Sequence, residues 1–196
     1  MSGKVECDEV YIVAGHKGRP PYVVAKLGRL GRRRRPTGAP GRGTLAGEKP
    51  PVLGMIQRNG EMVLHMLENV QQRTIKPILT KTIQMGTTVF TDEYNIYARS
   101  REWGYQHFTV NHGQGEYARD DDNDGFHKVH INTIIEGFWS LLRSWLRHHR
   151  GISQEELPLY LAFFEFVHNI RRRGKALLAL LLTLLLAPCN PGLAIK

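Results

Sequence analysis

Apolar and polar residues alternate along several short stretches in the first half of the chain, a pattern typical of β-strands. Residues 4–14 place two sets of side chains on opposite faces: Val5, Cys7, Glu9 and Tyr11 on one, and Glu6, Asp8, Val10 and Ile12 on the other. Residues 52–57 and 61–66 predict two further strands. The pair Asn59-Gly60 between them predicts the tight turn of a β-hairpin.

Helical and strand patterns then follow each other along the rest of the chain. The predicted elements, in order, are a helix over 74–84, a strand over 88–91, a helix over 94–103, a strand over 105–110 and helices over 129–147 and 154–172. Pro77 is expected in the first turn of its helix, where its missing N–H costs nothing. This order predicts a mixed α/β domain with helices on the faces of a sheet.

Two segments have a different character. Residues 16–49 are basic and rich in glycine and proline, which predicts a loop, and they include the block Arg32–Arg35. Residues 176–187 (ALLALLLTLLLA) are apolar but shorter than the roughly 20 residues of a membrane span. We expect a buried terminal helix or an oligomer contact there, with a membrane-surface anchor as the alternative. The predicted division is a domain over 1–172 and a leucine-rich helical tail over 173–196.

Composition and charge narrow the function classes. The 196 residues include 27 Lys and Arg against 18 Asp and Glu, so the formal net charge is +9, which favours a polyanionic partner. An apolar content of 41% excludes a disordered chain. Cys7 and Cys189 lie too far apart in the sequence for a disulfide framework or a cysteine metal site, and with no apolar run near Met1 they indicate a cytoplasmic protein.

Three carboxylates stand out by their positions. Asp8 lies within the first predicted strand, Asp92 follows a later one, and Glu136 lies early in the long helix. Carboxylates brought to one point repel each other unless a cation neutralises them, and their hard oxygens suit magnesium or manganese. Glu9 and Glu93 directly follow the two aspartates, and only one residue of each pair can face a given site. The alternation alone leaves open which one does.

The helix around Glu136 has two predicted faces. Ile134, Phe138, Leu141 and Trp145 are spaced as an apolar stripe, and Glu136, Ser140, Arg143 and Arg147 follow the same spacing on another face. Arg143 lies two turns from Glu136 and is placed to approach a phosphate beside an acid-bound metal. The alternative is an ordinary exposed helix face.

Six strings of the sequence together resemble the DDE catalytic domain of ISXO-like bacterial insertion-sequence transposases. The similarity runs from Val5 to Leu178 with the motifs in the order found in that family. The strings are VECDEVYIVAGHKG, GRGTLAGEKPPVLGMIQRNG, VFTDEYNIYA, VNHGQGEYA, VHINTIIEGFWSLLRSWLRHHRGIS and FFEFVHNIRRRGKALL.

This resemblance implies a ribonuclease-H-like mixed sheet with flanking helices and an α-helical C-terminal extension. It implies cleavage and strand transfer of DNA by in-line displacement, with two divalent ions, Mg or Mn, as cofactors. Carried over residue by residue, the two aspartates of the family fall on Asp8 and Asp92 and its glutamate on Glu136. These three residues would hold the metals, and the partners would be the terminal inverted repeats, target DNA and a second copy of the chain.

The sequence departs from the family pattern in two places. Many members have a lysine seven residues after the glutamate, where this chain has Arg143, which keeps the charge but not the geometry. Longer members carry a zinc-ribbon region before this domain, whereas here the first strand begins close to Met1. We therefore expect a catalytic fragment, a truncated reading frame or a decayed copy. The alternatives to a transposase are a catalytically silent DNA-binding remnant and a nuclease without strand transfer.

Basic residues are the predicted DNA contacts, because neutralised phosphates release counterions. The candidates are Lys17, Arg19, Arg32, Arg33, Arg34, Arg35 and Arg42 in the basic loop and Arg147 in the long helix. His130 and Asn132, just before the glutamate, are candidates to line the site, and Asn132 is equally suited to cap the helix.

Overall fold

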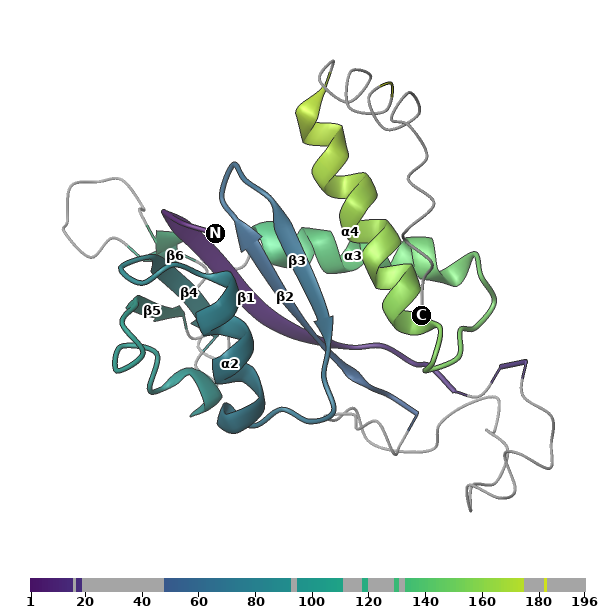
Figure 1. Cartoon of the computed structure of the whole chain (residues 1–196), viewed down its shortest axis with the longest axis horizontal. Helices are drawn as coiled ribbons and strands as arrows, with labels where there is room; N and C mark the ends of the chain where they lie inside the picture. Colours follow the sequence, from purple (N-terminus) through teal and green to yellow (C-terminus); the bar gives the residue numbers. More distant parts are fainter. Residues whose placement is uncertain are drawn as a thin grey trace, which may run out of the picture.

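A five-stranded mixed sheet forms the centre of the structure (Figure 1). The computed structural model describes residues 1–15, 17–18, 48–92, 95–110, 118–119, 129–130, 133–174 and 182. The strands are β1 (Lys4–Tyr11), β2 (Pro51–Gln57), β3 (Met62–Met66), β4 (Thr88–Asp92) and β5 (Gln106–Val110), in the order β3-β2-β1-β4-β5. Strand β1 pairs antiparallel with β2 and parallel with β4, so it lies at the centre of the sheet.

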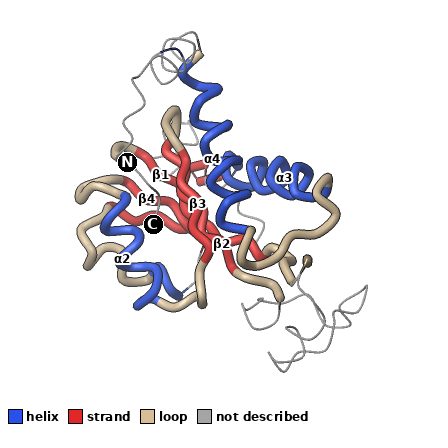
Figure 2. The backbone as a smooth tube through the Cα atoms, turned by 45° about the vertical axis from the view of Figure 1, so that its right-hand side comes forward, coloured by secondary structure: helices blue, strands red, loops and turns tan. Residues whose placement is uncertain are grey.

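Helices cover both faces of this sheet. Helix α2 (Gln72–Thr82) lies on one face, and α3 (Thr133–Arg147) and α4 (Leu157–Arg173) lie on the other (Figure 2). A 3₁₀ turn, η1 (Asn95–Tyr97), follows β4, and the two-residue strands β6 (Ala118–Arg119) and β7 (Val129–His130) pair with each other. This mixed α/β architecture is compatible with a ribonuclease-H-like fold. None of the helices among the described residues is both long and apolar enough to cross a membrane.

The side chains of β1 point alternately to the two faces of the sheet and so contribute to an apolar core on each face. Val5 and Cys7 are fully buried in the core beneath α2, whereas Val10 and Ile12 belong to the core beneath α3 and α4. Successive strand residues point to opposite faces, so one strand supplies both layers. The predicted faces of residues 4–12 are therefore confirmed.

Helix α4 supplies hydrogen-bond partners to the backbone of β3, the edge strand of the sheet. The Asn169 side chain accepts a hydrogen bond from the Met62 N–H at 2.8 Å and donates one to the Met62 carbonyl at 2.9 Å. Glu165 accepts a further bond from the Leu64 N–H at 2.9 Å. Edge strands need such partners, because unpaired backbone groups would pair with another chain.

The predicted helix over 94–103 is wrong. The described part of this segment contains η1 and then turns, with hydrogen bonds that span three residues, as from the Ser100 N–H to the Tyr97 carbonyl. A 3₁₀ turn rises about 2.0 Å per residue against about 1.5 Å in an α-helix. This larger rise helps a short crossover return from the end of β4 to the start of the parallel strand β5.

Three smaller expectations also need correction. Helix α2 begins at Gln72, so Pro77 lies in its second turn rather than its first. Helix α3 begins at Thr133 rather than at residue 129, because residues 129 and 130 pair with β6. The stripe that α3 buries consists of Ile135, Phe138, Trp139, Leu142 and Leu146, and Leu141 is 60% exposed. The helix is apolar over a wide arc, and its rotation is set by the sheet beneath it.

His107 makes the stability of the fold depend on pH. Its ring is buried in β5, with Nε2 2.9 Å from the Thr91 hydroxyl. Burial, assisted by the charge of Arg101, lowers the pKa of His107 to about 4. An unfolded histidine takes up its proton near pH 6.5, so the contribution of neutral His107 is complete above that pH and is lost as the pH falls towards 4.

We predict that the free energy of unfolding falls more steeply from pH 6.5 to pH 4 in the parent than in the variant His107→Gln. Urea denaturation at several pH values in this window measures both slopes. Equal slopes would show that His107 does not carry this dependence.

Candidate active site

Asp8 occupies a half-buried position in the central strand, and both of its carboxylate oxygens have a hydrogen-bond donor. Oδ1 accepts from the Glu9 N–H at 2.8 Å, and Oδ2 accepts from the indole Nε1 of Trp139 at 2.8 Å. Trp139 belongs to α3, so this bond joins the helix to the sheet. A carboxylate oxygen has two lone-pair sites, so a hydrogen bond to one oxygen does not by itself prevent that oxygen from binding a cation.

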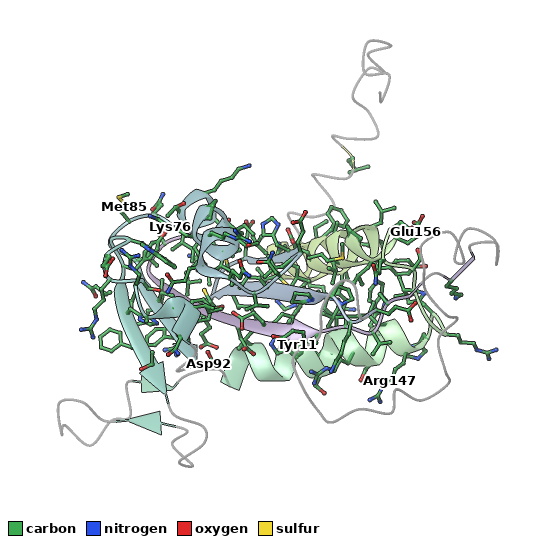
Figure 3. The ribbon with its side chains drawn as sticks, turned by 90° about the horizontal axis from the view of Figure 1, so that it is seen from below. Tyr11, Lys76, Met85, Asp92, Arg147 and Glu156 are labelled. Carbon is green, nitrogen blue, oxygen red and sulfur yellow. The ribbon has the colours of Figure 1, made fainter. Side chains whose placement is uncertain are left out.

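Asp92 ends the parallel strand next to β1. The pairing of the two strands sets Glu6 level with Phe90, and Asp8 and Asp92 each follow two residues later on the same face. Arg58 marks this face, because its guanidinium lies 4.3 Å from the centre of the Phe90 ring and 2.9 Å from the Glu6 carboxylate. Figure 3 labels Asp92 at the end of β4 and Arg147 at the end of α3.

Glu9, the neighbour of Asp8, faces the other side of the sheet. Its carboxylate accepts a hydrogen bond from the hydroxyl of Tyr97, a fully buried residue. Burial, and then the charge of Glu9, raise the pKa of Tyr97 well above its usual value, so the phenol stays a donor. Of the pair Asp8-Glu9, therefore, it is Asp8 that faces α3. Glu93 lies outside the described residues, so for the pair Asp92-Glu93 the structure shows only where Asp92 lies.

Glu6 anchors the beginning of α3. Its side chain is 1% exposed, forms an ion pair with Arg58 and accepts a hydrogen bond from the Ile135 N–H at 3.4 Å. Ile135 is the third residue of the helix, and its N–H is one of the groups that have no partner within a helix. The positive end of the helix dipole also favours a carboxylate there.

Position 136 follows Ile135 directly on the helix backbone, and the structure describes only the backbone of this glutamate. Phe138 and Trp145 on α3 pack against Phe164 of α4, which fixes the flank of the helix that faces β3. A residue that precedes Trp139 by three positions lies about 60° from it, on the flank away from Phe138. Position 136 therefore lies on the flank of α3 opposite α4.

A missing side chain on β2 makes room for Trp139. Gly54 pairs with Asp8, and a Cβ atom at Gly54 would lie 2.4 Å from the indole Cη2 of Trp139. Trp139 is 4% exposed, so the indole lies packed across β1 and β2. The sequence interpretation missed this role of Trp139. A glycine within a predicted strand was the available signal, since it often marks a close approach.

The basic candidates are only partly described. Arg143 and Arg147 are exposed on α3 and line a cavity at the end of β1. The Lys17 ammonium donates to the carbonyls of His149 and Gly151 at 2.6 and 2.9 Å. His130 lies in β7 with only its backbone described. Arg19, Arg32, Arg33, Arg34, Arg35, Arg42 and Asn132 lie outside the described residues.

The carboxylate oxygens of Asp8 and Asp92 are ligands that suit a hard divalent cation, and both residues lie on the same face of the sheet. Among the described side chains, which do not include that of Glu136, no group of three His, Cys, Asp or Glu residues could hold a metal. Cys7 contributes nothing to such a site. Burial, together with the charges of Glu9, Asp8 and Glu6, raises the pKa of its thiol well above the usual value, so the sulfur stays protonated.

The sheet order and the aspartates on adjacent parallel strands define an α/β domain of the kind compatible with the ribonuclease-H-like class. The profile of the ISXO2-like transposase domain matches residues 1–169, and the chain belongs to this transposase family.

The chain is also similar to two proteins with transposon-related names. The chain is 34% identical over 191 residues to an uncharacterized protein in the transposable element ISH50 of Halobacterium salinarum, which covers 93% of this chain and 58% of that protein. It is 28% identical over 104 residues to an uncharacterized transposase-like protein of Haemophilus influenzae, covering 53% of this chain and 77% of that protein. The chain thus spans little more than half the length of the Halobacterium protein. No solved structure matches it significantly.

Two glycine-to-alanine variants test the packing of Trp139. Gly54→Ala forces the indole to move, and we predict a loss of about 1–3 kcal/mol in the free energy of unfolding. Gly137→Ala is the matched control, because Gly137 is exposed on α3 with nothing within 4 Å of the added Cβ. It should gain about 0.5–1 kcal/mol from helix propensity. Denaturant titrations measure both, and an unchanged Gly54→Ala protein would contradict the packing described.

Proposed function

We propose that this chain is the catalytic domain of an insertion-sequence transposase that cleaves DNA at the element ends and joins it to target DNA. The observation that carries the proposal is the placement of Asp8 and Asp92 on one face of adjacent parallel strands, with α3 docked on Asp8 through Trp139. Asp8, Asp92 and Glu136 would hold two divalent ions, Mg or Mn. The transposase family of the chain supports this chemistry.

The docking of α3 supports the inclusion of Glu136. Two contacts set the height of the helix above β1: the Ile135 N–H on Glu6 and the Trp139 indole on Asp8. Glu136 lies between these two contacts in the sequence and on the flank of α3 opposite α4. Its backbone is therefore close to the face of β1 that carries Asp8.

Each residue of the proposed site has a distinct task. Divalent ions, when bound, would activate the attacking oxygen and stabilise the leaving oxygen. Asp8, Asp92 and Glu136 would bind them, and the indole of Trp139 orients the Asp8 carboxylate. Arg143, one turn beyond Trp139 on α3, would hold a phosphate of the bound strand with its planar fork of donors.

Basic residues would bind the rest of the DNA. The net charge of +9 favours a polyanion, and Lys17 and Arg147 lie exposed near the end of α3. Residues 16–49 would add the other predicted contacts. We propose that residues 1–172 act as one domain, with 173–196 as an appended tail. A second copy, the two inverted repeats and target DNA would complete the assembly in the bacterial cytoplasm.

Substitution of each carboxylate tests the proposal. We predict that Asp8→Asn, Asp92→Asn and Glu136→Gln each abolish Mg²⁺- or Mn²⁺-dependent cleavage of DNA that carries the element ends, while DNA affinity stays within about twofold of the parent, since direct phosphate contacts are untouched. Glu9→Gln is the matched control, because its carboxylate faces the other side of the sheet and glutamine still accepts from Tyr97. It should cleave like the parent.

The products distinguish the alternatives. Joining of a pre-cleaved 3′-hydroxyl end to target DNA is expected of a transposase, and cleavage without joining would identify a nuclease. Salt-sensitive DNA binding with no metal-dependent turnover would identify a silent binding remnant. Cleavage that persists in the triple variant would overturn the assignment of the three carboxylates.

A further pair of variants tests whether Trp139 positions Asp8. Trp139→Phe keeps an aromatic ring but removes the N–H that Asp8 accepts, and we predict a loss of about 10–100-fold in cleavage at limiting Mn²⁺, partly restored at high Mn²⁺. Trp145→Phe is the control, since Trp145 packs on Phe164 with ring centres 5.2 Å apart. Equal metal dependence of both variants would rule out a positioning role.

A further inference from the structure

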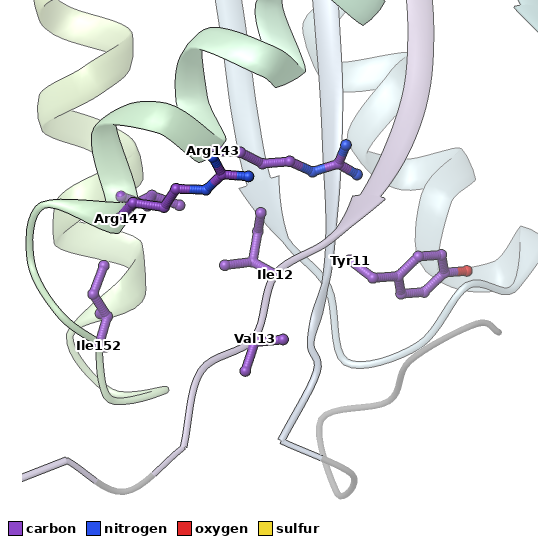
Figure 4. A pocket seen from close by; sticks show the side chains of 8 residues that line it. Tyr11, Ile12, Val13, Arg143, Arg147 and Ile152 are labelled. Carbon is purple, nitrogen blue, oxygen red and sulfur yellow. The ribbon is translucent and has the colours of Figure 1, made fainter. Parts of the chain in front are cut away.

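A cavity of about 390 Å³ lies where β1 leaves the sheet, beyond Asp8 along the strand. Its floor is apolar and buried, formed by Ile12, Leu146 and Ile152. Arg143 and Arg147 line the cavity from α3: in Figure 4, Arg147 extends towards Ile12, and Arg143 extends towards the side on which Tyr11 lies. Pockets that take small organic groups have volumes of about 300–1,000 Å³ and such mostly apolar walls.

The backbone around the cavity is paired rather than loose. The Gly15 N–H donates to the Ile152 carbonyl at 3.2 Å, and the Gln154 N–H donates to the Gly15 carbonyl at 2.9 Å. Lys17 closes the turn after α3 through its bonds to His149 and Gly151. The chain after β1 and the chain after α3 therefore hold each other in place, and the cavity is formed before any ligand arrives.

The charges at the cavity have one sign. Among the eight described residues that line it, two are arginines and none is acidic. Arg143 and Arg147 are four positions apart on α3, so their guanidinium groups lie on one side of the helix. Arginine forks match the oxygens of phosphate, while the aliphatic floor suits an apolar or flat organic group. A phosphodiester with an unstacked base offers both chemistries together.

The distance to the active site agrees with this ligand. Ile12 follows Asp8 by four residues, and a strand rises about 3.3 Å per residue, so the floor lies about 13 Å along β1 from the Asp8 position. This distance corresponds to about four nucleotides of a stacked DNA strand, at about 3.4 Å each, and to fewer in an extended one.

We propose that this cavity, named here the β1-end pocket, binds an unpaired nucleotide of the DNA strand that enters the active site. Ile12, Leu146 and Ile152 would receive its base, and Arg143 and Arg147 would hold the adjoining phosphates. The inference rests on the proposed function, because it takes DNA as the substrate. It adds that the substrate strand is single-stranded within about four nucleotides of the reacting phosphate.

Binding in EDTA tests the pocket separately from metal-dependent chemistry. The probes are a short blunt duplex and the same duplex with a single-stranded extension of about four nucleotides that carries 2-aminopurine at one position at a time. We expect the full chain to bind the extended duplex about tenfold more tightly, a difference of about 1.4 kcal/mol. The fluorescence of 2-aminopurine should change at one or two positions.

Two variants with similar chemistry locate the effect. Val13→Glu adds a negative charge to the pocket at a residue that is 37% exposed, and it should remove the preference for the extended duplex. Met85→Glu is the matched control, because Met85 is 79% exposed near the α2 face and does not line the pocket. It should keep the preference. Arg147→Gln should weaken binding of the extended duplex and reduce its salt slope by about one contact.

The outcomes separate the pocket from the proposed function. Equal binding of blunt and extended duplexes by the parent, or equal effects of Val13→Glu and Met85→Glu, would overturn the pocket assignment. Asp8→Asn should retain the preference for the extension, because the pocket does not use that carboxylate. A parent that prefers the extension yet cleaves no DNA would support the pocket and refute the catalytic proposal.

Discussion

The attachment of α3 to the central strand is the constraint on which the proposed site depends. Two side chains on one face of β1 accept hydrogen bonds from this helix: Glu6 from the backbone of Ile135 and Asp8 from the indole of Trp139. Because Glu6 and Asp8 are two residues apart, they point the same way, and the two bonds fix both the rotation and the position of the helix. Gly54, which pairs with Asp8, has no side chain and leaves room for the indole.

Acidic side chains lie along β1 and β4, and two arginines lie further along, towards the end of α3. Glu6 is neutralised by Arg58 at the start of the strand, and Asp8 and Asp92 follow on the same face. Beyond them, Arg143 and Arg147 border the β1-end pocket. The carboxylates that would bind divalent cations in the proposed site are thus followed along β1 by arginines that would bind phosphates. Separating the two by a few residues of one strand limits their mutual neutralisation.

The sequence predicted much of this arrangement because local patterns decide strands and amphipathic helices. The alternation of residues 4–12 predicted both faces of β1, and the Asn59-Gly60 turn predicted the β2–β3 hairpin. Where the local sequence favoured no single structure, tertiary packing determined the structure that formed. The segment after β4 has helical spacing but adopts η1 and turns, and the apolar stripe of α3 is rotated by one residue from the predicted one, so that Trp139 rather than Leu141 is buried.

By itself, the sequence determined the order of the elements, the basic charge, the family resemblance and the three candidate carboxylates. Only the tertiary structure decided that Asp8, and not Glu9, faces α3, since period-two alternation gives two faces without saying which one a helix will cover. It also decided that Trp139 packs on Gly54 and bonds to Asp8, and that residues 12, 146 and 152 share one cavity. These are contacts between residues far apart along the chain, and they exist only after the sheet and its helices have packed together.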